Sequence, residues 1–368
     1  MILCFSGTGN SRYVADILAE GLDDIVIDIA PAVSDFVRKW GPYPSQVRQF
    51  AKEASGSKTG PSFVSDDGEP FILVCPVYAW RIPEAVSGLL ETATFIGSDK
   101  IYVVASYGDD VANADVYAQQ MAEKAGLVFG GFAGVLMPST YAKIKKMPKP
   151  SVARAIRAEA RAQTAQIIEQ IKCGAFLEKG KTGAMSSLKS GAMHRTFRVY
   201  EAGSKHFVVS KRCSRCGRCE LFCPVNDIKM TEDGIEFGKR CISCYACIHR
   251  CPDAAIDVKD QSETNGRYIC PSYREEMEDL AYEDTRLAKR AAREAKRAKQ
   301  EEERRAAKAA AEVAAAVAVQ NGADPELAKK QAEAAAAATL SKKKGGRLAA
   351  KRAAMQAAAQ ANETTERS

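Results

Sequence analysis

The sequence predicts an α/β protein built on a doubly wound parallel sheet, followed by a small cysteine-rich unit and a helical tail. Short runs rich in Val, Ile and Leu alternate with longer helical patterns over residues 1–172. Eight cysteines lie between residues 213 and 251, and alanine dominates the chain after residue 280. Alternating strands and helices are typical of a parallel sheet covered on both faces, and clustered cysteines favour a metal centre.

The first segment carries the signals of five strands and several helices. We expect strands over residues 1–5, 25–29, 71–75, 100–105 and 132–137. We expect helices over residues 10–20, 81–92, 111–125 and 150–171, with a weaker pattern over 44–54. In such sheets, ligands bind beyond the carboxyl ends of the strands, so the loops that follow the strands are the candidate binding segments.

The cysteines form an internal repeat with an offset of 28 residues. Its two copies are Cys213-x-x-Cys216-x-x-Cys219-x-x-x-Cys223-Pro and Cys241-x-x-Cys244-x-x-Cys247-x-x-x-Cys251-Pro. In two-cluster ferredoxins, the cysteine before proline ligates the other cluster. That rule gives cluster one Cys213, Cys216, Cys219 and Cys251, and gives cluster two Cys241, Cys244, Cys247 and Cys223. Zinc is the alternative, but zinc ribbons need only two separated C-x-x-C pairs for each metal.

The repeat resembles the bacterial two-cluster ferredoxins over both of its copies, within a segment that we expect to span residues 211–275. That resemblance implies two [4Fe–4S] clusters and low-potential transfer of single electrons. Many basic residues flank the cysteines: Lys211, Arg212, Arg215, Arg218, Lys239, Arg240, His249 and Arg250. They would raise the cluster potentials and attract the acidic face of a redox partner, or they are solvated loop charges.

A loop with small and hydroxyl-bearing residues follows the first predicted strand and opens the first helix. It reads Ser6-Gly7-Thr8-Gly9-Asn10-Ser11. Free N–H groups at a helix N-terminus attract phosphate, and glycine lets the backbone approach it. No Gly-Lys-[Ser/Thr] follows, which excludes a Walker loop, and Arg12 stands where a dinucleotide fingerprint needs its third glycine.

Two later loops follow the third and fourth predicted strands. Their candidate ligand-binding residues are Tyr78, Trp80, Ser106, Tyr107, Gly108 and Asp109. The aromatic side chains could stack on a flavin, or they could cap the core beneath the loops. The loop at residues 6–11 closely resembles the FMN phosphate loop of flavodoxins. That resemblance implies a flavodoxin-like domain that binds FMN rather than FAD or a dinucleotide.

Over residues 1–275 the chain resembles a family of anaerobe proteins in which a flavodoxin-like domain is fused to a two-cluster ferredoxin. The matching segments include residues 137–141 and 266–268. The resemblance implies an electron-transfer iron–sulfur flavoprotein, either a carrier or a component of an oxidoreductase. The alternative is a ferredoxin whose flavodoxin-like domain is empty and serves for docking. The donor and the acceptor of electrons stay open.

Residues 173–210 are expected to link the two domains. Gly, Ser and Lys dominate residues 178–192 and indicate a flexible crossing segment. His194 and His206 also lie in this linker, flanked by basic residues, and are interpreted as solvated loop histidines, with a ligand role as the alternative. Outside the repeat, Cys4 and Cys75 are expected in neighbouring buried strands, whereas Cys173 and Cys270 fit no ligand pattern.

Residues 276–368 form the tail. From residue 281 onward, 31 of 88 residues are alanine, and 19 Lys and Arg face 12 Asp and Glu, which accounts for the whole net charge of +7. We expect helices, with a second one starting at Asp324-Pro325. The tail is a solvated or assembly helix, or alternatively a polyanion binder. Nucleic acid is disfavoured because no aromatic residue follows Tyr282.

No apolar run is long enough to span a membrane, and residues 1–5 resemble a strand rather than a secretory signal. Cysteines clustered for metal rather than disulfides are typical of a reducing compartment. The sequence therefore predicts a cytoplasmic protein.

Overall fold

The computed structural model describes residues 1–44, 58–66, 68–179, 183–259, 265–320, 324–327 and 329–336. The chain divides into two compact units, Met1–Met277 and Glu278–Ser368. The helix expected over residues 44–54 falls outside the described residues, apart from Pro44. Within the described part, no helix is both long enough and apolar enough to cross a membrane.

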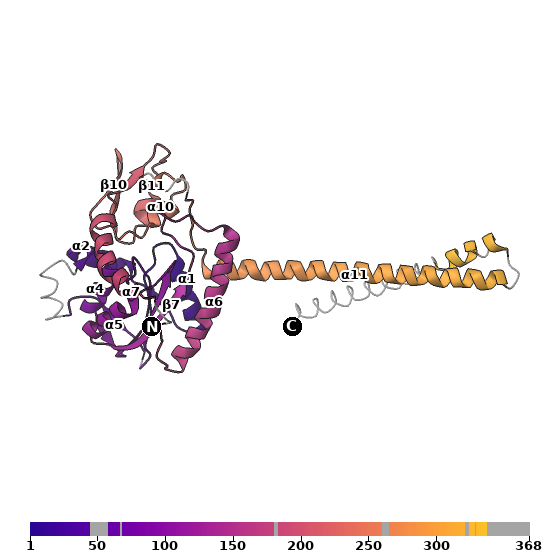
Figure 1. Ribbon diagram of the computed structural model, residues 1–368, viewed down its shortest axis with the longest axis horizontal. Coiled ribbons are helices and arrows are strands. Elements are labelled where there is room, and N and C mark those ends of the chain that lie inside the picture. The colour runs from indigo at the N-terminus through magenta and orange to yellow at the C-terminus, as the bar shows by residue number, and fades with distance from the viewer. Residues whose placement is uncertain are drawn as a thin grey trace, which may run out of the picture. The chain divides into compact units, whose positions relative to one another are not determined.

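A five-stranded parallel sheet forms the centre of the first unit (Figure 1). Its strands are β1 (Ile2–Cys4), β2 (Val26–Asp28), β4 (Phe71–Pro76), β6 (Lys100–Tyr107) and β7 (Val128–Leu136). Their order is β2-β1-β4-β6-β7, and every pairing is parallel. Counted along the chain this is the order 2-1-3-4-5 of flavodoxin-like sheets. The predicted doubly wound, flavodoxin-like fold is therefore confirmed.

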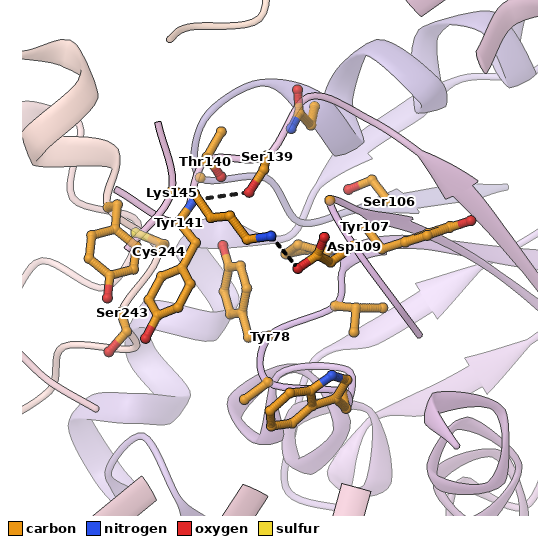
Figure 2. Close-up of a pocket in the computed structure, with 18 of the residues that line it drawn as sticks. Tyr78, Ser106, Tyr107, Asp109, Ser139, Thr140, Tyr141, Lys145, Ser243 and Cys244 are labelled. Atoms are coloured by element: carbon orange, nitrogen blue, oxygen red, sulfur yellow. Dashed lines mark hydrogen bonds and ion pairs between the residues drawn. The ribbon is translucent and has the colours of Figure 1, made fainter. Parts of the chain in front are cut away.

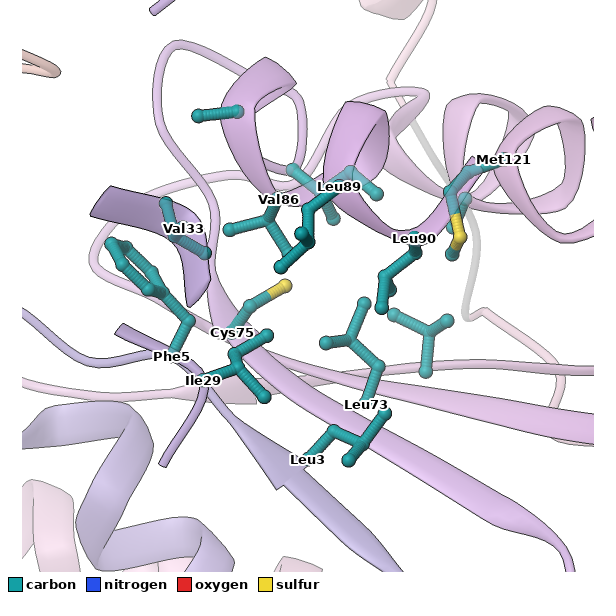
Figure 3. Close-up of a cluster of buried hydrophobic side chains, with 14 of the residues drawn as sticks. Leu3, Phe5, Ile29, Val33, Leu73, Cys75, Val86, Leu89, Leu90 and Met121 are labelled. Carbon is teal, nitrogen blue, oxygen red and sulfur yellow. The ribbon is translucent and has the colours of Figure 1, made fainter. Parts of the chain in front are cut away.

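Helices cover both faces of this sheet because side chains alternate along each strand. On one face, Leu3 and Leu73 pack against α2 (Ala30–Trp40), α4 (Glu84–Thr92) and α5 (Ala114–Ala125) (Figure 3). On the other face, Ile2 and Ile72 pack against α1 (Asn10–Leu22) and α6 (Pro150–Lys172). Cys4 and Cys75 are buried in these two cores, as expected. A small parallel pair, β3 (Ser62–Val64) and β5 (Thr94–Ile96), was not predicted.

The cysteine-rich segment repeats its backbone as well as its sequence. It holds two antiparallel pairs, β8 (Phe207–Val209) with β11 (Ile256–Val258), and β9 (Ile228–Thr231) with β10 (Gly234–Phe237). The first cysteine loop (residues 213–219) runs into the short helix α9 (Arg218–Leu221), and the second cysteine loop (residues 241–247) runs into α10 (Ala246–Arg250). Left-handed residues recur at the offset of 28: Arg215 and Ser243, Gly217 and Tyr245, Asn226 and Ala254.

Residues 186–201 form a winding helical segment made of α7 (Ser186–Leu188), η2 (Lys189–Met193), α8 (His194–Thr196) and η3 (Phe197–Glu201). Part of this segment lies where the sequence indicated a flexible crossing over 178–192. That expectation was wrong for residues 186–192, because contacts with distant loops hold these residues in place. His194 is only 5 % exposed, so its interpretation as a solvated loop histidine is also wrong.

A buried ion pair fastens the start of α11 (Tyr273–Gln320) to α6 within the first unit. Arg157 donates from Nε and Nη2 to both carboxylate oxygens of Glu276, at 2.8 and 2.9 Å. Its Nη1 donates to the hydroxyl of Tyr268 at 3.3 Å. This bidentate contact satisfies both buried charges.

The second unit is helical over residues 278–320, 325–327 and 329–336. Asp324 Oδ1 accepts the backbone N–H of Leu327 at 3.0 Å, so Asp324 caps the second helix as predicted. Nearly all described side chains of this unit are exposed, which fits the scarcity of bulky apolar residues. The expectation of helix beyond residue 336 lies outside the described residues.

Candidate cofactor sites

A cavity of about 530 Å³ opens beyond the carboxyl ends of β1, β4 and β6 (Figure 2). Its size is ordinary for a small-molecule or cofactor site. Eleven of the twelve residues predicted to bind flavin line it: Ser6, Gly7, Thr8, Asn10, Ser11, Tyr78, Trp80, Ser106, Tyr107, Gly108 and Asp109. The twelfth, Gly9, is not part of the lining. It has a φ of 99° and forms the left-handed turn that lets α1 begin there.

The loop at residues 6–11 presents polar groups to the cavity. The N–H of Gly9 donates to Ser6 Oγ at 3.2 Å, and the hydroxyls of Ser11 and Ser106 share a hydrogen bond of 2.8 Å. The first N–H groups of α1 have no acceptor within the helix, because a helix leaves its first turn unpaired. Arg12 instead pairs with Asp16 at 2.7 Å. The loop can therefore hold an anion with N–H and O–H donors and without a cation.

Asn10 supplies a buried acceptor that has no partner among the described residues. Its Nδ2 donates to the carbonyl of Pro138 at 2.8 Å, whereas its Oδ1 is buried and makes no hydrogen bond. A buried acceptor without a donor is costly, and a ligand hydroxyl in the cavity would satisfy it. The ribityl chain of FMN carries hydroxyls of this kind, so the residues present fit the cofactor.

The aromatic loop after β4 holds a strained turn at the cavity. Tyr78 and Arg81 exchange two backbone hydrogen bonds, of 2.8 and 3.2 Å, around Ala79 and Trp80. Both central residues are left-handed, with φ of 46° and 66°, a conformation that usually takes Asn or Gly. Such a strained conformation is stable only where many contacts from surrounding residues hold the backbone in place.

The helical segment 186–201 supplies those surroundings. His194 Nδ1 lies 2.8 Å from the carbonyl of Ala79, and Ser190 Oγ donates to the carbonyl of Trp80 at 3.0 Å. Arg198 pairs with Glu84 at 2.7 Å on the following helix. The segment also contributes Ala192, Met193, Thr196, Phe197 and Glu201 to the cavity lining. Sequence reasoning missed this wall, because a Gly-, Ser- and Lys-rich stretch carries no signal of distant partners.

Two ion pairs join the loops at this cavity. Lys145 Nζ lies 2.8 Å from Asp109 Oδ2, as Figure 2 shows. Lys143 forms a second pair with Glu201. Asp109 was predicted as a site residue, whereas Lys145 and Glu201 were not, since neither belongs to a recognisable motif.

The second cysteine loop forms another wall of the same cavity. Ser243, Cys244 and Tyr245 all line it. A Cβ placed on Gly7 would lie 2.9 Å from Cys244 Cβ and 3.2 Å from the hydroxyl of Tyr78. Glycine at position 7 therefore lets the predicted phosphate loop lie directly against a predicted cluster ligand.

Among the eight predicted ligands, the two cysteines that precede proline have matching sulfur environments. Asp227 N–H donates to Cys223 Sγ, and Ala255 N–H donates to Cys251 Sγ, both at 3.2 Å. Burial raises the pKa of Cys244 to about 12 and the pKa of Cys247 well above its ordinary value. Because cluster ligands are thiolates, such buried cysteines need both N–H donors and the positive charge of iron.

Within the described ranges, no three or more His, Cys, Asp or Glu side chains converge as the ligands of a single metal ion. Each thiolate of a cubane binds a different iron, and four such thiolates enclose one cluster. The twice-repeated loops, their left-handed residues and their N–H···S contacts therefore fit two clusters, although no single-ion site is formed.

A comparison with known protein families identifies the cysteine-rich segment. Residues 205–252 match the family described as the 4Fe-4S dicluster domain. The search of curated proteins gave no match. The chain therefore combines a flavodoxin-like domain with a 4Fe-4S dicluster domain.

Three solved structures are similar to the N-terminal half. A two-electron reduced flavodoxin from Megasphaera elsdenii is 15% identical over 45% of this chain and 99% of its own, with a TM-score of 0.23. An NAD(P)H:quinone oxidoreductase from Methanothermobacter marburgensis is 12% identical over 46% and 94%, with a TM-score of 0.27. An FMN-dependent NADH-azoreductase from Bacillus anthracis is 11% identical over 46% and 97%, with a TM-score of 0.25.

Proposed function

We propose that this protein is an electron-transfer iron–sulfur flavoprotein in which bound FMN exchanges electrons with two [4Fe–4S] clusters. When bound, the flavin would take electrons in pairs while the clusters pass them singly. Cys213, Cys216, Cys219 and Cys251 would hold cluster one. Cys241, Cys244, Cys247 and Cys223 would hold cluster two.

The contact between Gly7 and Cys244 carries the proposal. It brings the loop suited to a phosphate and a cysteine suited to a cluster into van der Waals contact at one cavity. The unpartnered Asn10 Oδ1 and the aromatic residues Tyr78, Trp80 and Tyr107 support FMN as the ligand. A flavin held there would lie beside the second cysteine loop and away from the first, whose residues do not line the cavity.

Anaerobic purification followed by iron, sulfide and flavin quantification tests the proposal. We expect about eight iron and eight sulfide per chain, from two clusters of four each, and one FMN after incubation with the cofactor. If the protein holds both clusters but does not bind FMN at high-micromolar concentration, the alternative is favoured, namely a ferredoxin whose flavodoxin-like domain serves for docking. Stoichiometric zinc in place of iron would remove the electron-transfer function altogether.

A further inference from the structure

The first cysteine loop is the exposed end of the cysteine-rich segment. Cys216 is exposed and Cys213 half-buried, with Ser214 and Arg215 exposed between them. In the second loop, Cys244, the counterpart of Cys216, is buried. The other positions do not differ, because Cys213 and Cys241 are both half-buried and Cys219 and Cys247 are both buried. Electron transfer between proteins falls off steeply with the distance between centres, so a partner can reach a centre in the first loop most closely.

Positive charge surrounds this exposed loop. Lys211, Arg215 and Arg218 are exposed, and none of the ion pairs between described residues involves any of them. Two acids lie close to the loop. Glu220 lies 3.2 Å from Lys229 and also accepts the N–H of Met230, and Asp253 Oδ2 accepts hydrogen bonds from the N–H and the hydroxyl of Ser214. The loop therefore presents an excess of positive charge to solvent.

An apolar spot lies beside these charges. Leu221 ends α9 with 77 % of its surface exposed. Next to it, the guanidinium of Arg250 lies 4.7 Å and that of Arg218 5.8 Å from the ring centre of Phe222. An apolar centre with a charged rim is the usual anatomy of a protein interface.

We propose that the first cysteine loop, with Lys211, Arg215, Arg218 and Leu221, is the docking surface for an acidic one-electron redox protein. We infer a negatively charged partner surface from charge complementarity with this loop. We expect the contact area to be small, because transient redox complexes have small interfaces. One electron moves from the reduced centre of one protein to the oxidised centre of the other, and no bond forms or breaks. The proposal rests on the proposed function only in requiring a cluster behind this loop.

The test is a stopped-flow measurement on the full-length, cluster-loaded protein. The protein is reduced with dithionite, freed of excess reductant and mixed with an oxidised acidic [2Fe–2S] ferredoxin at several ionic strengths. We expect Lys211→Gln with Arg218→Gln to lower the second-order rate about three- to tenfold at low salt, with the loss closing at high salt. Arg215 is left unchanged because its guanidinium donates to the carbonyl of Glu232 and braces the loop.

The matched control removes the same charge from the second unit, as Lys289→Gln with Arg293→Gln. An equal loss in this control, or no loss in the loop variant, overturns the docking surface. Leu221→Ser gives an independent readout that changes no charge, and it should slow the reaction at every ionic strength. An unchanged rate for Leu221→Ser would also count against the surface.

Chemical reduction separates this test from the proposed function. If the loop effect appears in a protein that never binds FMN, the docking surface stands and the flavin route fails. If bound flavin, once chemically reduced, passes electrons to the clusters but the loop variants react normally with the partner, the flavin route stands and the docking surface fails. Iron content is measured on every variant, so that a lost cluster is not mistaken for lost docking.

Discussion

The two cysteine loops share one sequence pattern and one backbone path, yet they have opposite surroundings. The first exposes Cys216 among basic side chains, whereas the second buries Cys244 against the cavity. The residues between the cysteines decide this difference. Where the first loop has Arg215, the second has Ser243, whose Oγ accepts the N–H of Gly203 at 2.7 Å.

The next aligned position shows the same effect more strongly. Gly217 in the first loop corresponds to Tyr245 in the second. The ring of Tyr245 lies 5.6 Å from that of Tyr141 and 5.8 Å from that of Phe207, so it packs the second loop against its neighbours. A duplicated motif can thus hold two chemically similar centres while its variable positions direct one inward and the other outward.

Removal of one cysteine from each loop should have the largest effect. We expect Cys216→Ser and Cys244→Ser each to lose about half of the iron, because each removes a ligand of one cluster. Only Cys244→Ser should also weaken FMN binding, since Cys244 contacts Gly7. Iron analysis and FMN titration measure the two effects. The exposed Cys173, changed to Ser, is the control and should alter neither, whereas wild-type iron content in both loop variants would refute the ligand assignment.

The segment around Tyr268 and Glu276 links the second cysteine loop region to helix α6 through buried polar contacts. The N–H of Tyr268 donates to His249 Nδ1 at 3.2 Å, and Arg157 joins Tyr268 to Glu276. Glu276→Gln would leave Arg157 buried without its counter-charge. We expect a loss of about 3–5 kcal/mol of stability, measured by denaturant unfolding, against no change for the exposed Glu278→Gln. Equal stability of the two variants would mean that the ion pair does not fasten α11.

The stability that the Arg157–Glu276 ion pair contributes should decrease at acidic pH. Burial opposes the charge of Glu276, but hydrogen bonds from Arg157 and Tyr13 outweigh it and hold the pKa of Glu276 below its usual value. A depressed carboxyl pKa contributes stability above the unfolded-state pKa and loses it as the pH falls through the folded-state pKa. The stability gap between wild type and Glu276→Gln should therefore be full at neutral pH and shrink below pH 4.5, the ordinary pKa of this group.

A smaller effect is expected at the phosphate loop. Thr8→Ala with Asn10→Ala should weaken FMN binding by about 1–3 kcal/mol for each lost hydrogen bond to the ligand. Arg12→Ala is the matched control on the same turn, because Arg12 pairs with Asp16 and does not line the cavity. Titration by flavin fluorescence distinguishes them, and similar losses in both variants would contradict the proposed phosphate site.

Much of this architecture could be predicted from local patterns. The strand and helix alternation gave the sheet, and the loop positions after β1, β4 and β6 gave eleven lining residues of the cavity. Helix α2 was missed although its signals are visible, namely Pro31 near its start, apolar Val33, Phe36, Val37 and Trp40 at helical spacing, and Gly41 at its end. The three-residue strands β3 and β5 are too short to produce a periodic pattern.

The remaining features could not be predicted, because they depend on contacts between distant residues. Gly7 was interpreted as room for phosphate, whereas the structure adds Cys244, 237 positions later in the sequence, as a second reason for glycine. The turn at Ala79 and Trp80 accepts hydrogen bonds from His194 and Ser190, which lie more than 100 positions later in the sequence. No local composition encodes such partners.

Deletion of the tail should have the smallest effect on the cofactors. We expect removal of residues 283–368 to leave iron content and FMN affinity unchanged, because the first compact unit ends at Met277 and the tail side chains are mostly exposed. Solubility or partner affinity should change instead, in a salt-dependent way, since the tail carries all of the net charge. A truncated protein that loses iron or melts much lower would show that the tail braces the first unit.

The contrast between the loops is tested most directly by the path of a single electron. FMN-loaded wild type, Cys216→Ser and Cys244→Ser are given one electron by flash reduction, and flavin and cluster absorbance are followed. We predict that the electron leaves the flavin at an unchanged rate in Cys216→Ser but remains on it in Cys244→Ser. Arrest in Cys216→Ser, or unimpeded transfer in Cys244→Ser, would show that the first loop and not the second serves the cavity.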